Sequence, residues 1–270
     1  MARWRRAVHR AWLDGDPPAE ACGHREDVLA GLRVLRAGPA AGAGPVVLYL
    51  HGGGYALGSP EVALPITERL SRRCDVVSID YRLAPEHPCP AAIDDALAAH
   101  RAVAAADPGR PIVLAGDSAG CNLALSVALL TRDGTGPFPA GLVLLSPHVD
   151  HDPAAGPPPG DRPSDLDRSS AEWLAAAYRG PLAADDPRLS PLRAELSGLP
   201  PMLIQVGTID TSFEQAVRLA RRARVAGVEV ILDVWDGLWH TWHYHRELPE
   251  ADRALAEAAA FARRLSDDAA

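Results

Sequence analysis

One segment constrains the fold more than any other: an apolar run at residues 112–115, followed by Gly116-Asp117-Ser118-Ala119-Gly120. The run predicts a short buried strand, and residues 122–130 predict a helix. A strand, a tight turn of small residues and a helix are the context of a nucleophile elbow, in which G-x-S-x-G presents a serine at the end of a sheet. Gly116 and Gly120 must be small because the turn is sharp. Ser118 then faces outward, beside the first N–H groups of the helix.

Composition limits the classes of protein that this chain can be. Its 270 residues, 47% of them hydrophobic, suffice for one large core, so we expect a single domain over residues 1–270. A net charge of −8 argues against a nucleic-acid partner, and no apolar run is long enough to span a membrane. The four cysteines lack metal or disulfide spacing, and the basic N-terminus lacks the apolar part of a secretory signal. We therefore expect a cytoplasmic protein; a homodimer remains open.

Predicted strands alternate with predicted helices along most of the chain. Residues 28–35 indicate a strand or hairpin, and further strands are expected at residues 46–50, 76–80, 112–115, 142–145, 202–206 and 228–234. The helices are expected at residues 65–73, 91–106, 122–130, 169–179, 213–225 and 251–265. This alternation predicts an α/β fold, with a mostly parallel sheet covered by helices on both faces.

The alternation breaks after residue 147. Residues 151–163 are rich in proline, glycine and aspartate, and the expected helix at 169–179 follows them. An insertion of this kind after a core strand predicts a cap or lid over about residues 148–187. Residues 1–25 are a second candidate cap element, because residues 3–13 fit a short amphipathic helix packed on the body of the protein.

Ser118 is a candidate nucleophile for acyl transfer. This chemistry needs an activated hydroxyl, a base oriented by an acid, and donors for the oxyanion. The N–H of Ala119 follows the nucleophile, and a Gly52-Gly53-Gly54 turn follows the strand at residues 46–50. Glycines suit that turn because the backbone itself must approach the substrate oxygen. No Lys-Ser or Lys-Thr pair follows them, which argues against a nucleotide-binding P-loop.

The acid and the base are expected after the serine in the chain. Asp210 follows the predicted strand at 202–206, and His240 follows the one at 228–234, so both lie at carboxyl ends of strands. His243 and His245 compete with His240 for the role of base. Asp233 and Asp236 compete with Asp210, which we prefer because Asp233 lies within a strand and Asp236 is too near the histidine in sequence. No pattern of carboxylates accompanies the three histidines, so no metal site is expected.

Several segments carry a resemblance to a known family. They are His51-Gly52-Gly53-Gly54-Tyr55, Asp80-Tyr81-Arg82-Leu83-Ala84-Pro85-Glu86-His87-Pro88, Gly116-Asp117-Ser118-Ala119-Gly120, Ser146-Pro147 and Leu199-Pro200-Pro201. From about residue 46 to its end, the chain resembles the hormone-sensitive-lipase-like α/β-hydrolases, the bacterial esterase branch. The resemblance implies the α/β-hydrolase fold, a small helical cap and no cofactor. It also implies a Ser118, Asp210 and His240 triad, an oxyanion hole made by Gly52, Gly53 and Ala119, and a scaffold role for residues 81–88.

The chain departs from the family pattern at three positions. Cys121 stands where the family usually has another glycine, and we expect this to affect packing alone. The acid loop reads Asp210-Thr211-Ser212, and Thr241-Trp242 follows the histidine. The last two departures bear on substrate range. The segment before His51 is also short for the family, so the N-terminal part of the cap is expected to be reduced.

Three functions fit these residues. The first is a serine carboxylesterase that hydrolyses small to medium acyl esters through an acyl-enzyme. Its site would be lined by aromatic residues, for each of which core packing is the alternative: Tyr55, Trp173, Tyr178, Trp239 and Trp242. The second is a tailoring hydrolase, lactonase or acyl cyclase that uses the same triad. The third, a ligand-binding protein on an inactive scaffold, would be expected to lack the histidine that His240 provides.

Overall fold

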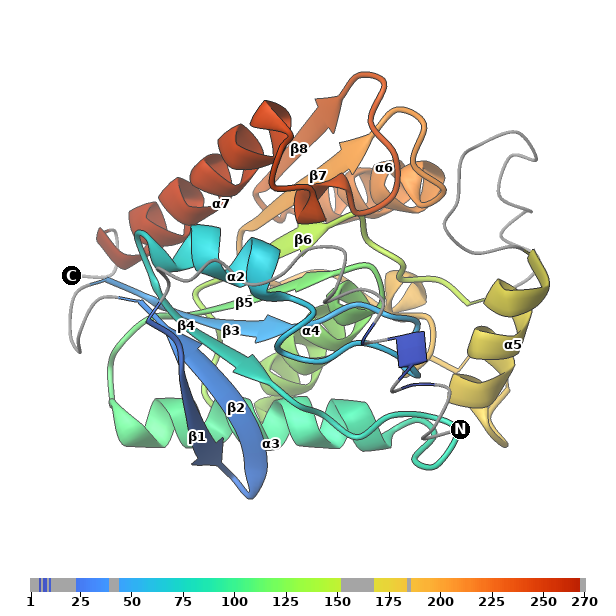
Figure 1. Ribbon diagram of the computed structural model, residues 1–270, viewed down its shortest axis with the longest axis horizontal. Helices are drawn as coiled ribbons and strands as arrows, with labels where there is room; N and C mark the ends of the chain where they lie inside the picture. The colour runs from blue at the N-terminus through green and yellow to red at the C-terminus, as the bar shows by residue number, and fades with distance from the viewer. Residues whose placement is uncertain are drawn as a thin grey trace.

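An eight-stranded sheet forms the centre of the computed structural model (Figure 1), which describes Arg5, Ala7, Val8, Arg10 and residues 23–38, 44–151, 168–183 and 186–267. The strand order is β1-β2-β4-β3-β5-β6-β7-β8. The first two strands form an antiparallel hairpin, β2 also pairs antiparallel with β4, and strands β3 to β8 are parallel. The strands are β1 (Arg25–Leu29), β2 (Leu32–Ala37), β3 (Val46–Leu50), β4 (Asp75–Ile79), β5 (Ile112–Asp117), β6 (Gly141–Leu145), β7 (Met202–Gly207) and β8 (Val230–Trp235).

Helices cover both faces of this sheet. The described α-helices are α2 (Leu64–Ser71), α3 (Ala91–Ala106), α4 (Ala119–Leu130), α5 (Arg168–Arg179), α6 (Phe213–Val225) and α7 (Pro249–Asp267). Three short helices join them: η1 (Thr131–Thr135), η3 (Pro191–Arg193) and η4 (Trp242–Tyr244). Helices α3, α4 and α6 pack on one face, and α2 and α7 pack on the other. None of the described helices is long and apolar enough to cross a membrane.

The position of β3 between two helical layers explains why its sequence is apolar throughout. Val46, Leu48 and Leu50 point toward α3 and α4, whereas Val47 and Tyr49 point toward α2 and α7. Successive side chains of a strand face opposite sides, so a strand between two helical layers needs apolar residues at every position. All five residues are buried. The carboxyl ends of the parallel strands point toward α5, at the right of Figure 1.

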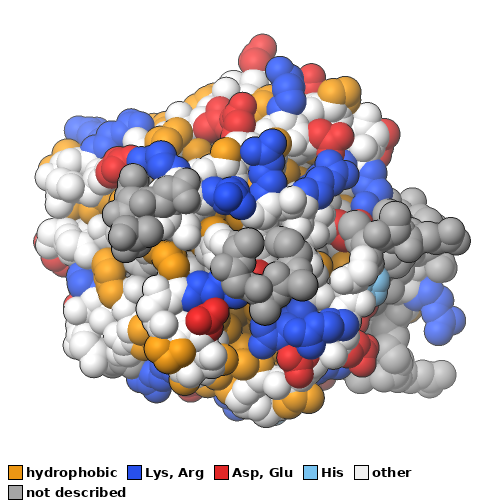
Figure 2. All heavy atoms as spheres, turned by 90° about the vertical axis from the view of Figure 1, so that its left-hand side faces the viewer, with side chains coloured by type: hydrophobic (Ala, Val, Ile, Leu, Met, Phe, Trp, Pro, Cys, Tyr) orange, Lys and Arg blue, Asp and Glu red, His pale blue; other side chains and the backbone are white. Residues whose placement is uncertain are grey.

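The opposite end of the sheet, formed by the amino ends of the parallel strands, faces the viewer in Figure 2. Arginine and carboxylate side chains intermix over this face, with scattered apolar groups between them. The chain's negative charge is therefore not gathered here into an acidic surface.

The structure confirms the predicted α/β architecture and the strand and helix type of each core segment. Several boundaries differ by one to three residues; β8, for example, begins at Val230, two residues after the predicted start at Val228. The N–H of Val228 donates to the carbonyl of Ala223, and Gly227 has a φ of +81°. Both features complete the end of α6, so the chain becomes extended later. Of the predicted cap elements, α5 and the flanking residues are described; residues 152–167 and most of residues 1–25 lie outside the described part.

Candidate active site

Ser118 lies in a sharp turn between β5 and α4. Its φ of +48° is in the left-handed region, which is rare for a residue other than glycine and marks a conformation held by its surroundings. A Cβ on Gly120 would collide with the carbonyl of Leu50, and one on Gly116 would lie 2.6 Å from the carbonyl carbon of Gly120. The two glycines are therefore required by close packing of the turn against the end of β3, as the sequence predicts.

Three side chains from three loops form a continuous hydrogen-bonded chain. The Ser118 hydroxyl lies 2.9 Å from His240 Nε2, and His240 Nδ1 lies 2.8 Å from Asp210 Oδ1. Asp210 follows β7 and is fully buried, whereas the side chain of His240, which follows β8, is 24% exposed. An imidazole that donates from Nδ1 to a carboxylate presents Nε2 as an acceptor for the serine proton.

The competing residues take no part in this hydrogen-bonded chain. Asp233 accepts hydrogen bonds from Gln205 and the Trp235 indole, and Asp236 accepts one from Thr208. The exposed His245 pairs with Glu247. His243 is fully buried and stacks on Trp242, and neither of its nitrogens has a hydrogen-bond partner among the described residues. The geometry thus favours His240 and Asp210 over every competitor that the sequence leaves open.

The electrostatic surroundings keep Asp210 ionised. Burial works to raise the pKa of its carboxyl, but the charge and hydrogen bond of His240, with hydrogen bonds from Ser146 and the Ser212 N–H, lower it to about 2. The Ser212 hydroxyl also donates to Asp210 Oδ1, at 2.8 Å. Ser212 therefore helps to hold the carboxylate in the acid loop, at one of the positions where the chain departs from its family.

Ser146 connects the acid loop and the histidine loop, a role that the sequence alone does not reveal. It follows β6 with a φ of +51°, and its hydroxyl oxygen accepts a hydrogen bond from the Thr241 N–H at 3.0 Å. The same hydroxyl is one of the groups that lower the pKa of Asp210. In the sequence, only the Ser146-Pro147 motif points to this position. Its place at the end of a strand beside the elbow explains why a serine there can reach both loops.

One predicted oxyanion donor is corrected by the structure. The N–H of Gly52 donates to Asp117 Oδ1 at 2.9 Å, so it is not available to a substrate oxygen. Asp117 is buried and also accepts hydrogen bonds from the hydroxyls of Tyr49 and Tyr244. The sequence shows three similar glycines but not which N–H a buried carboxylate takes. The N–H groups of Gly53 and Gly54 have no partner among the described residues, and Ala119 lies at the first turn of α4.

Helix α2, which follows the glycine turn, holds the histidine loop from behind. Arg69 donates to the backbone carbonyls of His243 and His245 and pairs with Asp252 on α7. Its neighbour Glu68 pairs with Arg246 at 2.6 Å. Only 5% of the Arg69 side chain is exposed, so these bonds lie largely away from water, where they fix the loop most firmly.

The five aromatic residues predicted to line the site differ in how deeply they are buried. Tyr55 and Tyr178 are buried and stack with ring centroids 3.5 Å apart, which joins the segment after the glycine turn to α5. Trp239 is partly buried, and Trp173 on α5 is 42% exposed. Trp242 is fully buried against Leu238, Ala251 and Ala254. The expectation that Trp242 lines the site is therefore wrong, because its ring fills the core beneath α7.

No cluster of histidine, cysteine, aspartate and glutamate among the described residues has the arrangement of a metal site.

Comparisons with known proteins agree with this geometry. The family of proteins with the alpha/beta hydrolase fold matches residues 47–244. An acetyl-hydrolase of Streptomyces hygroscopicus is 40% identical over 235 residues, covering 83% of this chain and 77% of that protein. An esterase of Acinetobacter venetianus is 35% identical over 249 residues, covering 89% of this chain and 82% of that protein.

A similar solved structure identifies the branch of the family. The crystal structure of an esterase from the bacterial hormone-sensitive lipase family is 36% identical, covers 97% of this chain and 90% of its own, and superposes with a TM-score of 0.89. Together with the sequence relatives, it shows that the chain belongs to the α/β-hydrolase family and is a carboxylic-ester hydrolase of the hormone-sensitive-lipase-like branch.

Proposed function

We propose that the chain is a serine carboxylesterase of small to medium acyl esters, in which Ser118 is the nucleophile, His240 the base and Asp210 the acid. The observation that carries this proposal is the pair of hydrogen bonds, 2.9 Å and 2.8 Å long, that joins the strained elbow serine to a buried carboxylate through one imidazole.

The first half of the reaction forms an acyl-enzyme. Ser118 Oγ attacks the ester carbonyl carbon while its proton passes to His240 Nε2. The N–H groups of Ala119 and Gly53, with Gly54 beside them, stabilise the negative oxygen of the tetrahedral intermediate. The intermediate then expels the alcohol, which takes the proton from His240. Asp210 stays ionised and stabilises the transient imidazolium.

The second half reverses these roles. His240 removes a proton from a water molecule, whose oxygen attacks the acyl carbon. The bond to Ser118 Oγ breaks, the serine regains its proton from His240, and the carboxylic acid leaves. Hydrolysis needs no other reactant.

Two observations support small to medium acyl groups. The stacked Tyr55 and Tyr178 are buried where α5 meets the segment after the glycine turn, and Leu174 of α5 packs against Gly54. One relative is an acetyl-hydrolase. A series of p-nitrophenyl esters from acetate to palmitate tests the proposal. We expect kcat/KM to be highest at acyl chains of two to about six carbons, about tenfold or more above the palmitate ester. A maximum at the longest chains would contradict it.

A further inference from the structure

A second imidazole lies beside the triad and has no role in the reaction described above. His148 follows Ser146-Pro147 at the end of β6, and its backbone N–H donates to the carbonyl of Ser118 at 3.2 Å. It is partly exposed, whereas the next two residues, Val149 and Asp150, are buried. The backbone bond therefore fixes His148, which is not fully buried, next to the nucleophile.

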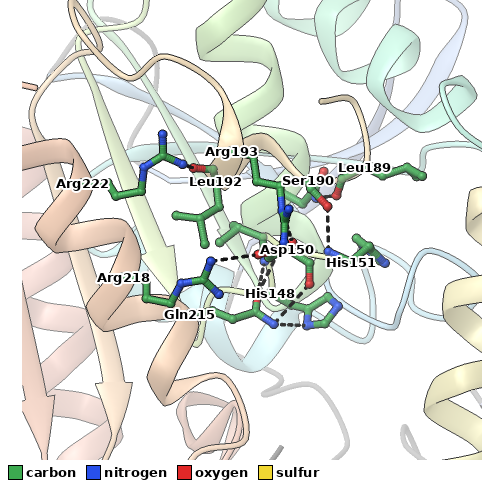
Figure 3. A network of polar contacts seen from close by, with 12 residues as sticks. His148, Asp150, His151, Leu189, Ser190, Leu192, Arg193, Gln215, Arg218 and Arg222 are labelled. Atoms are coloured by element: carbon green, nitrogen blue, oxygen red, sulfur yellow. Dashed lines mark hydrogen bonds and ion pairs between the residues drawn. The ribbon is translucent and has the colours of Figure 1, made fainter. Parts of the chain in front are cut away.

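Gln215 on α6 determines how this ring is protonated (Figure 3). Gln215 Oε1 accepts hydrogen bonds from the backbone N–H groups of Val149 and Asp150, at 2.7 Å and 3.0 Å. Backbone N–H groups can only donate, so the amide oxygen must face them. The amide NH₂ then faces the Asp150 carbonyl and His148 Nδ1, each 3.4 Å away.

The tautomer of His148 follows from this orientation. Because an amide NH₂ donates, His148 Nδ1 must accept and carries no proton. In a neutral imidazole the proton is then on Nε2, which has no hydrogen bond to a described residue. Burial, assisted by the charge of His240, lowers the pKa of His148 to about 4, so the ring is neutral near pH 7.

The segment that carries His148 is held from both sides. The fully buried carboxylate of Asp150 pairs with Arg193 at 3.1 Å and with Arg218 at 3.3 Å. The N–H of His151 donates to the Ser190 hydroxyl at 2.9 Å. Together with the His148 N–H bond to Ser118, these bonds fix the backbone on both sides of Gln215's contacts. The Nε2–H of His148 is thus a donor held in place before any substrate arrives.

We propose that His148 is a substrate-binding residue whose Nε2–H donates a hydrogen bond to an acceptor oxygen in the acyl or alcohol part of the ester. The proposal rests on the esterase function above and names its substrate class: esters with an ether, carbonyl or hydroxyl oxygen a few bonds from the reacting carbonyl. A purely aliphatic chain would cover this donor without satisfying it, which weakens its binding in the transition state.

Matched pairs of esters test this proposal. On the acyl side, p-nitrophenyl methoxyacetate is compared with p-nitrophenyl butyrate, and the 3-methoxypropionate with the valerate. On the alcohol side, 2-methoxyethyl acetate is compared with butyl acetate. Each pair differs by one oxygen in place of one CH₂, and intrinsic reactivity cancels when the ether-to-alkyl ratio of kcat/KM in a variant is divided by that of the wild type.

Three variants separate the donor from the shape of the side chain. His148→Phe keeps a ring but loses the donor, and we expect the ether-to-alkyl ratio to fall about three- to tenfold in at least one pair. His148→Gln places an NH₂ near the former Nε2 and should keep most of the preference. Gln215→Glu leaves His148 in place but can only accept from Nδ1. At a pH high enough for the ring to stay neutral beside the new carboxylate, the ring proton moves away from Nε2 and the ratio should also fall.

The pair that responds identifies the acyl or the alcohol side as the bound part. Ratios that stay within twofold of the wild type in every pair for His148→Phe would overturn the proposal, as would an unchanged preference in Gln215→Glu. If the wild type hydrolysed none of the six esters, the proposed function itself would fail, which is a different result from a lost preference.

Discussion

Among the single residues of the site, the proposed mechanism depends most on the assignment of Asp210 as the acid. Asp210 alone among the three nearby aspartates reaches the imidazole of His240, at 2.8 Å, whereas Asp233 and Asp236 bind other side chains. Asp210→Asn keeps the shape but removes the charge and favours the wrong tautomer. It should lower kcat on the order of a thousandfold or more, with little change in KM.

Steady-state kinetics with p-nitrophenyl acetate measures this effect. Asp233→Asn and Asp236→Asn serve as matched controls and should stay within about tenfold of the wild-type kcat. A collapse of kcat in Asp236→Asn, with near-normal turnover in Asp210→Asn, would show that Asp236 is the acid and that Asp210 is not.

The buried imidazole of His243 should make the stability of the fold depend on pH. Burial lowers its pKa to about 3, below the usual value of 6.5, so the unfolded chain binds a proton more readily than the folded one between these values. The free energy of unfolding should therefore fall as pH drops from 6.5 toward 3, by about 1.5 kcal/mol between pH 6.5 and 5 from this residue.

Urea unfolding at several pH values checks this prediction with His243→Leu. The variant should show a flatter pH dependence between pH 6.5 and 5, whatever its stability at pH 7. A variant with the same slope as the wild type would show that another group is responsible.

At the scale of elements, helix α2 links the glycine turn to the histidine loop. Arg69→Gln would leave the carbonyls of His243 and His245 without their charged donor in a buried place. We expect a loss of about 2–4 kcal/mol in the free energy of unfolding, and a lower kcat because His240 is less firmly placed.

Arg72, one residue after the end of the same helix, is a matched control because its side chain is 68% exposed. Arg72→Gln should change stability by less than about 0.5 kcal/mol. Equal losses in the two variants, measured by denaturant unfolding, would show that the bonds of Arg69 do not hold the loop.

The strands and helices differ in how well the sequence predicts them and the residues that they carry. Strands such as β3 and β5 and the elbow are predicted correctly because their patterns are local: continuous apolar runs, and glycines where a Cβ would collide. Ser118, His240 and Asp210 can be selected because chain order and strand ends limit the candidates. Gly52 is misjudged because its partner, Asp117, comes from a distant segment, and Trp242 because its packing against α7 is a tertiary contact. The roles of Ser146 and Gln215 likewise depend on contacts that no local pattern encodes.

In the molecule as a whole, α5 lies at the carboxyl ends of the parallel strands (Figure 1), and its Leu174 packs against Gly54 of the glycine turn. Tyr178 provides the stacking contact with Tyr55. Tyr178→Leu should therefore lower kcat/KM for small esters about tenfold, while the free energy of unfolding falls by no more than about 2 kcal/mol.

Trp173→Leu on the same helix is the control, since Trp173 is 42% exposed, and kcat/KM should stay within about threefold of the wild type. Thermal unfolding and ester kinetics on the three proteins distinguish the outcomes. A large loss of stability with unchanged kcat/KM in Tyr178→Leu would mean that α5 supports the fold and not the site.

Ser118, activated by His240, is the proposed nucleophile of this ester hydrolase. Labelling with a p-nitrophenyl phosphonate, followed by intact-mass measurement and peptide mapping, tests it most directly. We expect one adduct per chain, on Ser118, with no adduct in Ser118→Ala and labelling slowed about a thousandfold in His240→Ala. An adduct on another residue, or full ester hydrolysis by Ser118→Ala, would contradict it.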